Sequence, residues 1–149
     1  MPYPVTIEQI APAYAAVGRV TCPVSELPKH VPALCGKAWN FIKANKIPTD
    51  GHMIALYRNT DLSAMQVEAG ARVLAPFQST PDIACVEIPA GSAAHTTHIG
   101  PYNQLKGAHD AIIAWLKSNN RQFATCWELY DHPDPDPAQT RTDIYYHLI

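Results

Sequence analysis

One acidic residue stands among tyrosines in the second half of the chain. Glu128 is followed two positions later by Tyr130, and further tyrosines occur at Tyr57 and Tyr145. Aromatic rings attract organic cations through the negative faces of their π-systems, and a carboxylate adds a full opposite charge. A fold that gathers these residues would bind a cationic aromatic compound at Glu128. By residue pattern alone, an ordinary solvent-exposed strand glutamate is the other interpretation.

The remaining residues that could do chemistry give weaker signals. The cysteines form no Cys-x-x-Cys pair, and no histidine pair lies nearby at a spacing typical of zinc ligands. We interpret them as small buried hydrophobic residues in a reducing compartment. His95 and His98 could share a metal only with ligands from elsewhere in the chain, so the sequence predicts no metal and no cofactor. The four cysteines are Cys22, Cys35, Cys85 and Cys126.

Length and charge limit the classes of function. The 149 residues fit one domain, expected over 1–149, and the composition is 47% hydrophobic and 16% charged, as in ordinary globular proteins. The formal net charge is -2, with 11 lysines and arginines against 13 acidic residues, which leaves little material for a nucleic-acid-binding face. No apolar run has the length of a membrane span, and the N-terminus lacks a signal-peptide layout. We therefore expect a cytoplasmic protein without nucleic-acid or membrane partners; the oligomeric state stays open.

Short sequence features of the first half of the chain recur in the second half. Trp39 in an apolar helical segment recurs as Trp115 at an offset of 76 residues, and Tyr57, at the end of IALY, recurs as Tyr130, at the end of WELY, at an offset of 73. These landmarks return in the same order at nearly the same spacing, which indicates an internal duplication with pseudo-repeats of about 3–75 and 80–149.

Each half has the element order β-β-α-β-β. Alternation of apolar and polar residues predicts the strands, apolar residues at helical spacing predict the helices, and Pro or Gly residues mark the turns between them. The predicted fold class is α+β, a duplicated module with antiparallel sheets, one helix per half and a central cleft between the halves. The Pro- and Asp-rich stretch 131–141 is expected to be a surface loop. The predicted strands are Val5–Ile10, Tyr14–Val20, His52–Tyr57, Met65–Val73, Asp82–Ile88, Ala93–His98, Thr125–Tyr130 and Thr142–Leu148, and the helices lie within Ser25–Asn45 and over Tyr102–Ser118.

Strand alternation sorts the side chains near Glu128 into two faces. Because Ile144, Tyr146 and Leu148 are apolar, we expect them under the helix, together with Trp127 and Leu129. Glu128 and Tyr130 would then point away from the helix, on the same side as Tyr145 and Tyr57. The first half has Ala55 at the position of Glu128, so the duplication places a single carboxylate on the expected cleft wall.

The second half of the chain resembles a known family. The motifs are Ile-Pro-Ala-Gly at 88–91, His98, Gly100-Pro101-Tyr102, Trp127-Glu128-x-Tyr130 and Thr142-x-Ile144. Together they resemble the GyrI-like, or effector-binding, domain of AraC-type and MerR-type multidrug-responsive regulators. The resemblance covers 88–148 closely and the first half more loosely. It implies a duplicated α+β module with a central ligand cleft.

The resemblance also implies roles for individual residues. In the family, an acid at the position of Glu128 contacts lipophilic cations, and aromatic residues, including one at the position of Tyr145, stack on them. Family members use helix aromatics at the cleft edge, so Trp39 is a ligand candidate, with a core position as the alternative for both Trp39 and Trp115. The chain departs from the family at Ala93-Ala94, where one aromatic is missing, and at His95 and His147. These departures predict a cleft of altered size and polarity, with His95 among its lining residues.

Three functions compete. The leading one is a stand-alone module that sequesters or senses a lipophilic, cationic small molecule between the two repeats. The second, implied by the resemblance, is a hydrolase of reactive cyclopropane-containing toxins, with Glu128 as general base and Tyr130 or His95 as proton donor. That chemistry would be helped by a carboxyl pKa raised by burial. The third is a protein-interaction role such as gyrase inhibition. The ligand-site candidates are Glu128, Tyr130, Tyr145, Tyr57, His95 and Trp39.

Overall fold

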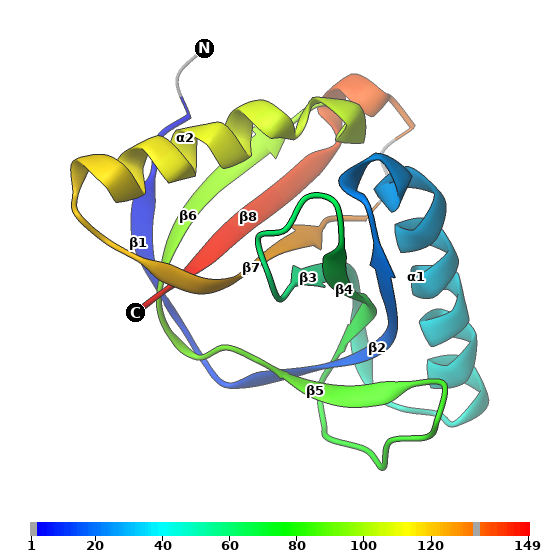
Figure 1. The fold of residues 1–149 in the computed structure, drawn as a ribbon. Coiled ribbons are helices and arrows are strands. Elements are labelled where there is room, and N and C mark those ends of the chain that lie inside the picture. The colour runs from blue at the N-terminus through cyan, green and yellow to red at the C-terminus, as the bar shows by residue number, and fades with distance from the viewer. Residues whose placement is uncertain (1–2, 133–134) are drawn as a thin grey trace.

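Eight antiparallel strands form one curled sheet that carries two long helices (Figure 1). The computed structural model describes residues 3–132 and 135–149. Residues 133 and 134 of the predicted loop lie outside the described residues. The strands are β1 (Thr6–Ile10), β2 (Ala13–Cys22), β3 (Thr49–Tyr57), β4 (Met65–Val73), β5 (Ala84–Ile88), β6 (Gly91–Ile99), β7 (Phe123–Tyr130) and β8 (Arg141–Leu148). The helices are α1 (Leu27–Ala44) and α2 (Lys106–Ser118), and three short 3-10 turns are η1 (Val24–Glu26), η2 (Tyr102–Gln104) and η3 (Pro137–Gln139).

Both halves follow the predicted order of two strands, one helix and two strands. The strand order in the sheet is β1-β6-β8-β7-β3-β4-β2-β5, so the last two strands of each half lie inside and β3 meets β7 at the centre. All pairings are antiparallel. The α+β fold class predicted from the sequence is confirmed. The antiparallel sheets expected from the sequence are here joined into one.

The curl of the sheet comes from two bent ribbons. β1 continues into β2 through Ala11-Pro12, and β5 continues into β6 through Pro89-Ala90. The two ribbons pair on both sides of these turns, with Ile10 opposite Gly91 and Ala13 opposite Ile88. Because β1 and β5 are the two edges of the sheet, this pairing links its ends and bends the strands between them.

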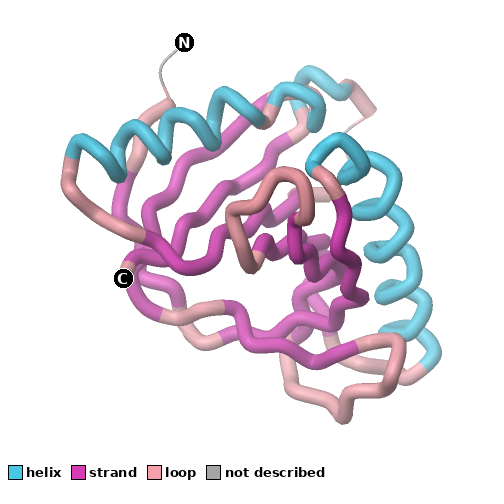
Figure 2. Tube along the Cα trace, viewed as in Figure 1, coloured by secondary structure: helices cyan, strands magenta, loops and turns pink. Residues whose placement is uncertain are grey.

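Both helices pack on the same face of the sheet, one over each half (Figure 2). The predicted stripe of α2 is confirmed, because its four apolar residues are buried against β6, β7 and β8. α1 contributes Leu34 and Cys35 to that same cluster, while its buried Ala38 and Ile42 pack on β2 and β4. The stripe of α2 consists of Leu105, Ala108, Ile112 and Leu116. None of the helices in the described residues is long and apolar enough to cross a membrane.

The opposite face lies inside the curl of the sheet and is apolar as well. Ile54, Leu56, Trp127 and Leu129 of the central strands pack there against residues of β2, β5 and β6. All four are at most 9% exposed. The central strands are therefore buried on both faces, which is unusual for an antiparallel sheet and removes the polarity difference by which faces are assigned from sequence.

The Gly100-Pro101-Tyr102 motif makes the turn from β6 to α2. Gly100 has a φ of +139°, a backbone conformation that favours glycine. Pro101 follows in an extended conformation and precedes η2, which leads into α2. The motif therefore shapes the turn into α2, with a 3-10 turn ahead of the helix.

Candidate functional site

The two halves of the chain meet at a pair of residues in the centre of the sheet. Ala55 of β3 lies directly opposite Glu128 of β7. The offset of 73 residues that relates Tyr57 to Tyr130 also relates Ala55 to Glu128. The twofold relation predicted from the sequence would therefore pass between these two residues, and only a methyl group stands opposite the carboxylate.

Glu128 faces the helices, contrary to the prediction from alternation. β7 and β8 pair so that Glu128 lies opposite Ile144 and Trp127 opposite Tyr145. Because Ile144 packs under α2, Glu128 shares the helix-covered face with it. The predicted placement of Trp127 and Leu129 under the helix was wrong for a physical reason. Both faces of β7 are buried, so an apolar side chain does not identify the face that carries the helix.

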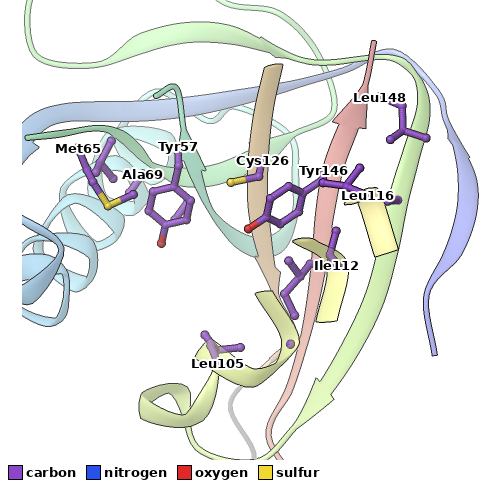
Figure 3. Packing of buried hydrophobic residues seen from close by; sticks show 14 of the residues in the cluster. Tyr57, Met65, Ala69, Leu105, Ile112, Leu116, Cys126, Tyr146 and Leu148 are labelled. Carbon is purple, nitrogen blue, oxygen red and sulfur yellow. The ribbon is translucent and has the colours of Figure 1, made fainter. Parts of the chain in front are cut away.

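Two tyrosines donate hydrogen bonds to one oxygen of the Glu128 carboxylate. The Tyr57 hydroxyl lies 3.0 Å and the Tyr130 hydroxyl 2.5 Å from Glu128 Oε1. Glu128 itself is 6% exposed. Figure 3 shows Tyr57 and Tyr146 on either side of Cys126, on the face toward the residues of α2. The structure thus brings together three of the predicted site residues, Glu128, Tyr130 and Tyr57.

The other carboxylate oxygen contacts His109 of α2, a residue that the sequence prediction missed. His109 Nε2 lies 2.6 Å from Glu128 Oε2, and His109 Nδ1 lies 2.7 Å from the Tyr146 hydroxyl. The signal was present in the sequence, because His109 follows Leu105 by four positions and therefore stands on the buried stripe of α2. A titratable residue on an apolar helix face has to find a polar partner.

These contacts decide the ionisation of the cluster. Burial alone would raise the pKa of Glu128, but hydrogen bonds from His109, Tyr130 and Tyr57 and the charge on His109 outweigh it, and the pKa is lowered. The raised carboxyl pKa expected from the sequence is therefore wrong. Burial and the nearby Glu128 charge raise the pKa values of Tyr57 and Tyr130 well above the usual value. The tyrosines stay protonated and donate, while Glu128 is an anion.

A second buried acid provides a useful comparison. Glu68 is 8% exposed and binds two permanent cations, with Arg19 Nε and Arg58 Nε each 2.7 Å from its carboxylate. Within residues 3–132 and 135–149, Glu128 forms an ion pair with no lysine or arginine, and His109 is the one cationic partner found. Glu68 therefore has two arginine partners, whereas the one cationic partner of Glu128 among the described residues is a histidine.

Tyr102 packs against this cluster from its solvent-exposed side. Its ring packs edge-on against Tyr130 at 5.4 Å between centroids, and the residue is 49% exposed. Its pKa is raised by partial burial and by the nearness of Cys35 of α1. Tyr102 of η2 therefore lies near both Tyr130 of the cluster and Cys35 of α1.

The other predicted ligand residues lie elsewhere. Tyr145 stacks on Trp127 at 5.3 Å, on the face opposite Glu128, and His95 packs on the same Tyr145 ring at 4.7 Å. The predicted placement of Tyr145 beside Glu128 was wrong by one position of register. Trp39 is partly buried against the cluster around Ala38 and carries Lys43 over its ring at 4.5 Å.

The cysteines and histidines form no metal centre in the part of the chain that the structure describes. All four cysteines are free; Cys22 and Cys126 are buried, and Cys35 and Cys85 are partly exposed. Burial raises the pKa of the Cys126 thiol to about 12, so it is not a nucleophile at neutral pH.

Comparisons with known proteins match this architecture. Residues 3–148 match the model of the GyrI-like small molecule binding domain. The C-terminal domain of EcmrR has a TM-score of 0.84 at 23% identity, with 100% of this chain and 99% of that chain covered. In the EcmrR–DNA complex the TM-score is 0.84 at 22% identity, and this chain covers 58% of the length of that regulator. No curated protein matches the chain.

More distant structures share the same fold. SAV2435 bound to tetraphenylphosphonium has a TM-score of 0.63 at 12% identity, with 100% of this chain and 94% of that chain covered. A hydrolase from Listeria innocua has a TM-score of 0.61 at 10% identity, again with 100% and 94% covered. At these identities the likeness is one of fold alone.

Proposed function

The chain belongs to the family of GyrI-like small molecule binding domains, and on this premise we propose that it binds a lipophilic organic cation at Glu128. The observation that carries the proposal is a buried, ionised carboxylate whose one cationic partner among the described residues is a histidine. A ligand cation would take the place of His109 at Glu128 Oε2. The hydroxyls of Tyr57 and Tyr130 would stay on Oε1 and hold the carboxylate in place.

The surroundings of Glu128 suit a lipophilic cation better than a small hydrated one. Tyr57, Tyr130 and Tyr102 provide rings for cation–π attraction and apolar contact. Metal ions that prefer oxygen take six or more ligands, whereas the described residues provide one carboxylate here. The neighbouring fold of SAV2435, bound to tetraphenylphosphonium, is compatible with this ligand class. The free cysteines fit the reducing, cytoplasmic environment expected from the sequence.

A charge series tests the proposal. We expect tetraphenylphosphonium to bind tighter than uncharged triphenylphosphine oxide by about tenfold or more, because only the cation gains the Glu128 charge. Isothermal titration calorimetry at constant ionic strength measures both affinities. Equal affinities for the two compounds would overturn the proposal.

His109 provides a second, independent test. His109→Phe keeps an aromatic side chain and removes the group that competes for Glu128 Oε2. If the ligand cation replaces His109, this variant should bind tetraphenylphosphonium several-fold more tightly than the native chain. Replacement of His30 by Phe is the control, because His30 is a partly exposed histidine that contacts Glu26 and not Glu128. A His109→Phe variant that binds the cation more weakly than this control would contradict the exchange.

The carboxylate of Glu128 with the hydroxyl of Tyr130 beside it supports a second candidate, the hydrolysis of reactive cyclopropane-containing compounds. Glu128 would act as general base to a water that opens the ring, and Tyr130 would protonate the leaving atom. The lowered pKa of Glu128 makes it a weak base at neutral pH, which is why we place hydrolysis second. Native mass spectrometry distinguishes the two functions, since a binding protein releases the compound intact and a hydrolase releases it with one water added.

A further inference from the structure

The central strands form the wall of a cavity on the face away from Glu128. This cavity has a volume of about 450 Å³ and is open to solvent, and it lies inside the curl of the sheet. β7 separates the two sites by the thickness of one strand, because Glu128 faces the helices and its neighbours face the cavity. The lining includes Ile54, Arg72, Ile88, Trp127, Leu129 and Tyr145.

The aromatic wall of this cavity is held in place by a chain of contacts. Tyr145 stacks on Trp127 at an interplanar angle of 16°. His95 packs on Tyr145 and contacts Asp143 through Nε2 at 2.8 Å. Asp143 also accepts a hydrogen bond of 2.8 Å from Thr97. A wall braced in this way is preformed, so a ligand would not have to order it on binding.

The floor and the rim differ in polarity. Ile54, Ile88 and Leu129 form an apolar floor and are at most 9% exposed. At the rim, Arg72 Nε lies 2.7 Å from the carboxylate of Asp50, and both side chains are about a third exposed or less. The two charges compensate each other, so a charged ligand would lose hydration without gaining a counter-ion. The guanidinium has five N–H donors, more than this one carboxylate oxygen can accept.

We propose that this cavity is a second small-molecule site, which takes a flat, uncharged aromatic compound with a hydrogen-bond acceptor. The aromatic part fills the space beside Trp127 and Leu129, and the acceptor reaches the spare donors of Arg72 at the rim. The volume lies within the range of about 300–1,000 Å³ that is usual for ligand pockets. This site differs from the Glu128 site in its lining residues, its face of the sheet and the charge of its ligand.

The probe for the test is 6-propionyl-2-dimethylaminonaphthalene, a flat, neutral, fluorescent ketone. We expect saturable binding, with its emission shifted to the blue and Trp127 emission quenched through energy transfer. Naphthalene-2-sulfonate, an anion of similar shape, should not displace it. Absence of saturation, or displacement by the sulfonate at comparable concentration, would overturn the proposal.

Filling the cavity provides the decisive variant. Ala13 lines the cavity and is partly exposed, so Ala13→Phe occupies the space beside Ile88 and should weaken probe binding by about tenfold or more. Ala11→Phe, at an exposed lining position in the turn, is a second variant that does not disturb the buried core. Ala124→Phe, at an exposed strand position outside the cavity lining, is the matched control. If the Ala11 and Ala13 variants bind the probe like this control, the cavity is not the site.

The proposals for the two sites can be tested independently of each other. Glu128→Gln should leave probe binding unchanged, and Ala13→Phe should leave tetraphenylphosphonium binding unchanged. Loss of probe binding in Glu128→Gln would place the probe in the Glu128 site and overturn the second site. If the native chain binds the probe but does not bind tetraphenylphosphonium, the proposed function fails and this inference stands.

Discussion

At the residue scale, the protein contains a buried anion whose one cationic partner among the described residues is a histidine. Glu128 accepts hydrogen bonds from Tyr57 and Tyr130 and contacts His109, whereas the other buried acid, Glu68, is bound by two arginines. The first half has Ala55 at the equivalent position, so the fold does not require an acid there. Glu128 nevertheless has three side-chain partners within the protein.

Glu128→Gln should therefore reduce both binding and stability while the protein still folds. The amide keeps the shape and can accept from the tyrosines, but it loses the charge. We expect cation binding to weaken by about 1–3 kcal/mol and the free energy of unfolding to fall by a similar amount, the range for hydrogen bonds to charged groups. Calorimetric titration and urea unfolding measure the two effects. Glu87→Gln, at an exposed position of β5, is the control and should change neither. A Glu128→Gln variant indistinguishable from this control would refute the role of Glu128.

The lowered pKa of Glu128 also predicts how stability depends on pH. Its folded-state pKa lies below the unfolded value of about 4.3, so its contribution is fully present above that pH and is lost as the pH falls through the folded-state value. The stability difference between the native chain and Glu128→Gln should be constant from pH 7 to about 5 and shrink below about 4. Urea unfolding across this range is the measurement. A difference that widens toward acid would mean that the pKa is raised.

At the element scale, the close packing of β2, β4 and α1 requires glycine at position 70, whereas position 36 on α1 does not require it. A Cβ on Gly70 of β4 would lie 1.8 Å from the carbonyl oxygen of Ala16 and 2.9 Å from Cβ of Ala38. The backbone of β2 cannot move away without breaking its pairing with β4. A Cβ on Gly36, in contrast, would meet nothing within 4 Å on the surface of α1.

We expect opposite effects of the same substitution at these two glycines. Gly70→Ala should lower the free energy of unfolding by about 3 kcal/mol or more, since the clash involves backbone rather than a flexible side chain. Gly36→Ala should raise it by about 0.5–1 kcal/mol, because alanine loses less conformational freedom in a helix. Thermal or urea unfolding of the two variants checks the pair, and a tolerated Gly70→Ala would contradict the close approach of β2, β4 and α1.

At the scale of the whole molecule, the chain is a GyrI-like small molecule binding domain whose charge leaves little material for a nucleic-acid-binding face. The formal net charge is -2, and this chain covers 58% of the EcmrR regulator seen with DNA. The aligned part of that regulator includes its C-terminal domain, which this chain matches over 99% of that domain's length.

The 149-residue chain alone should therefore show no sequence-specific DNA binding. Neutralising phosphates requires clustered lysines and arginines, and several of the arginines here already bind acids within the fold. Gel-shift titration at physiological salt is the measurement, with EcmrR as a positive control for its own site. A specific shift at submicromolar protein would contradict this expectation.

Local patterns in the sequence determined the element order, most strand boundaries, and the grouping of Glu128 with Tyr57 and Tyr130. Helical spacing and strand alternation act over a few residues, so they can be recognised in a single chain. The tertiary structure alone decided that Glu128 faces the helices, that His109 contacts it and that Tyr145 lies on the other face. These facts depend on the register between β7 and β8 and on the rotation of α2 about its axis, both set by packing between distant segments. Since both faces of β7 are buried, polarity does not distinguish a buried face of the strand from an exposed one. The sequence of β7 therefore does not indicate which face the helices cover.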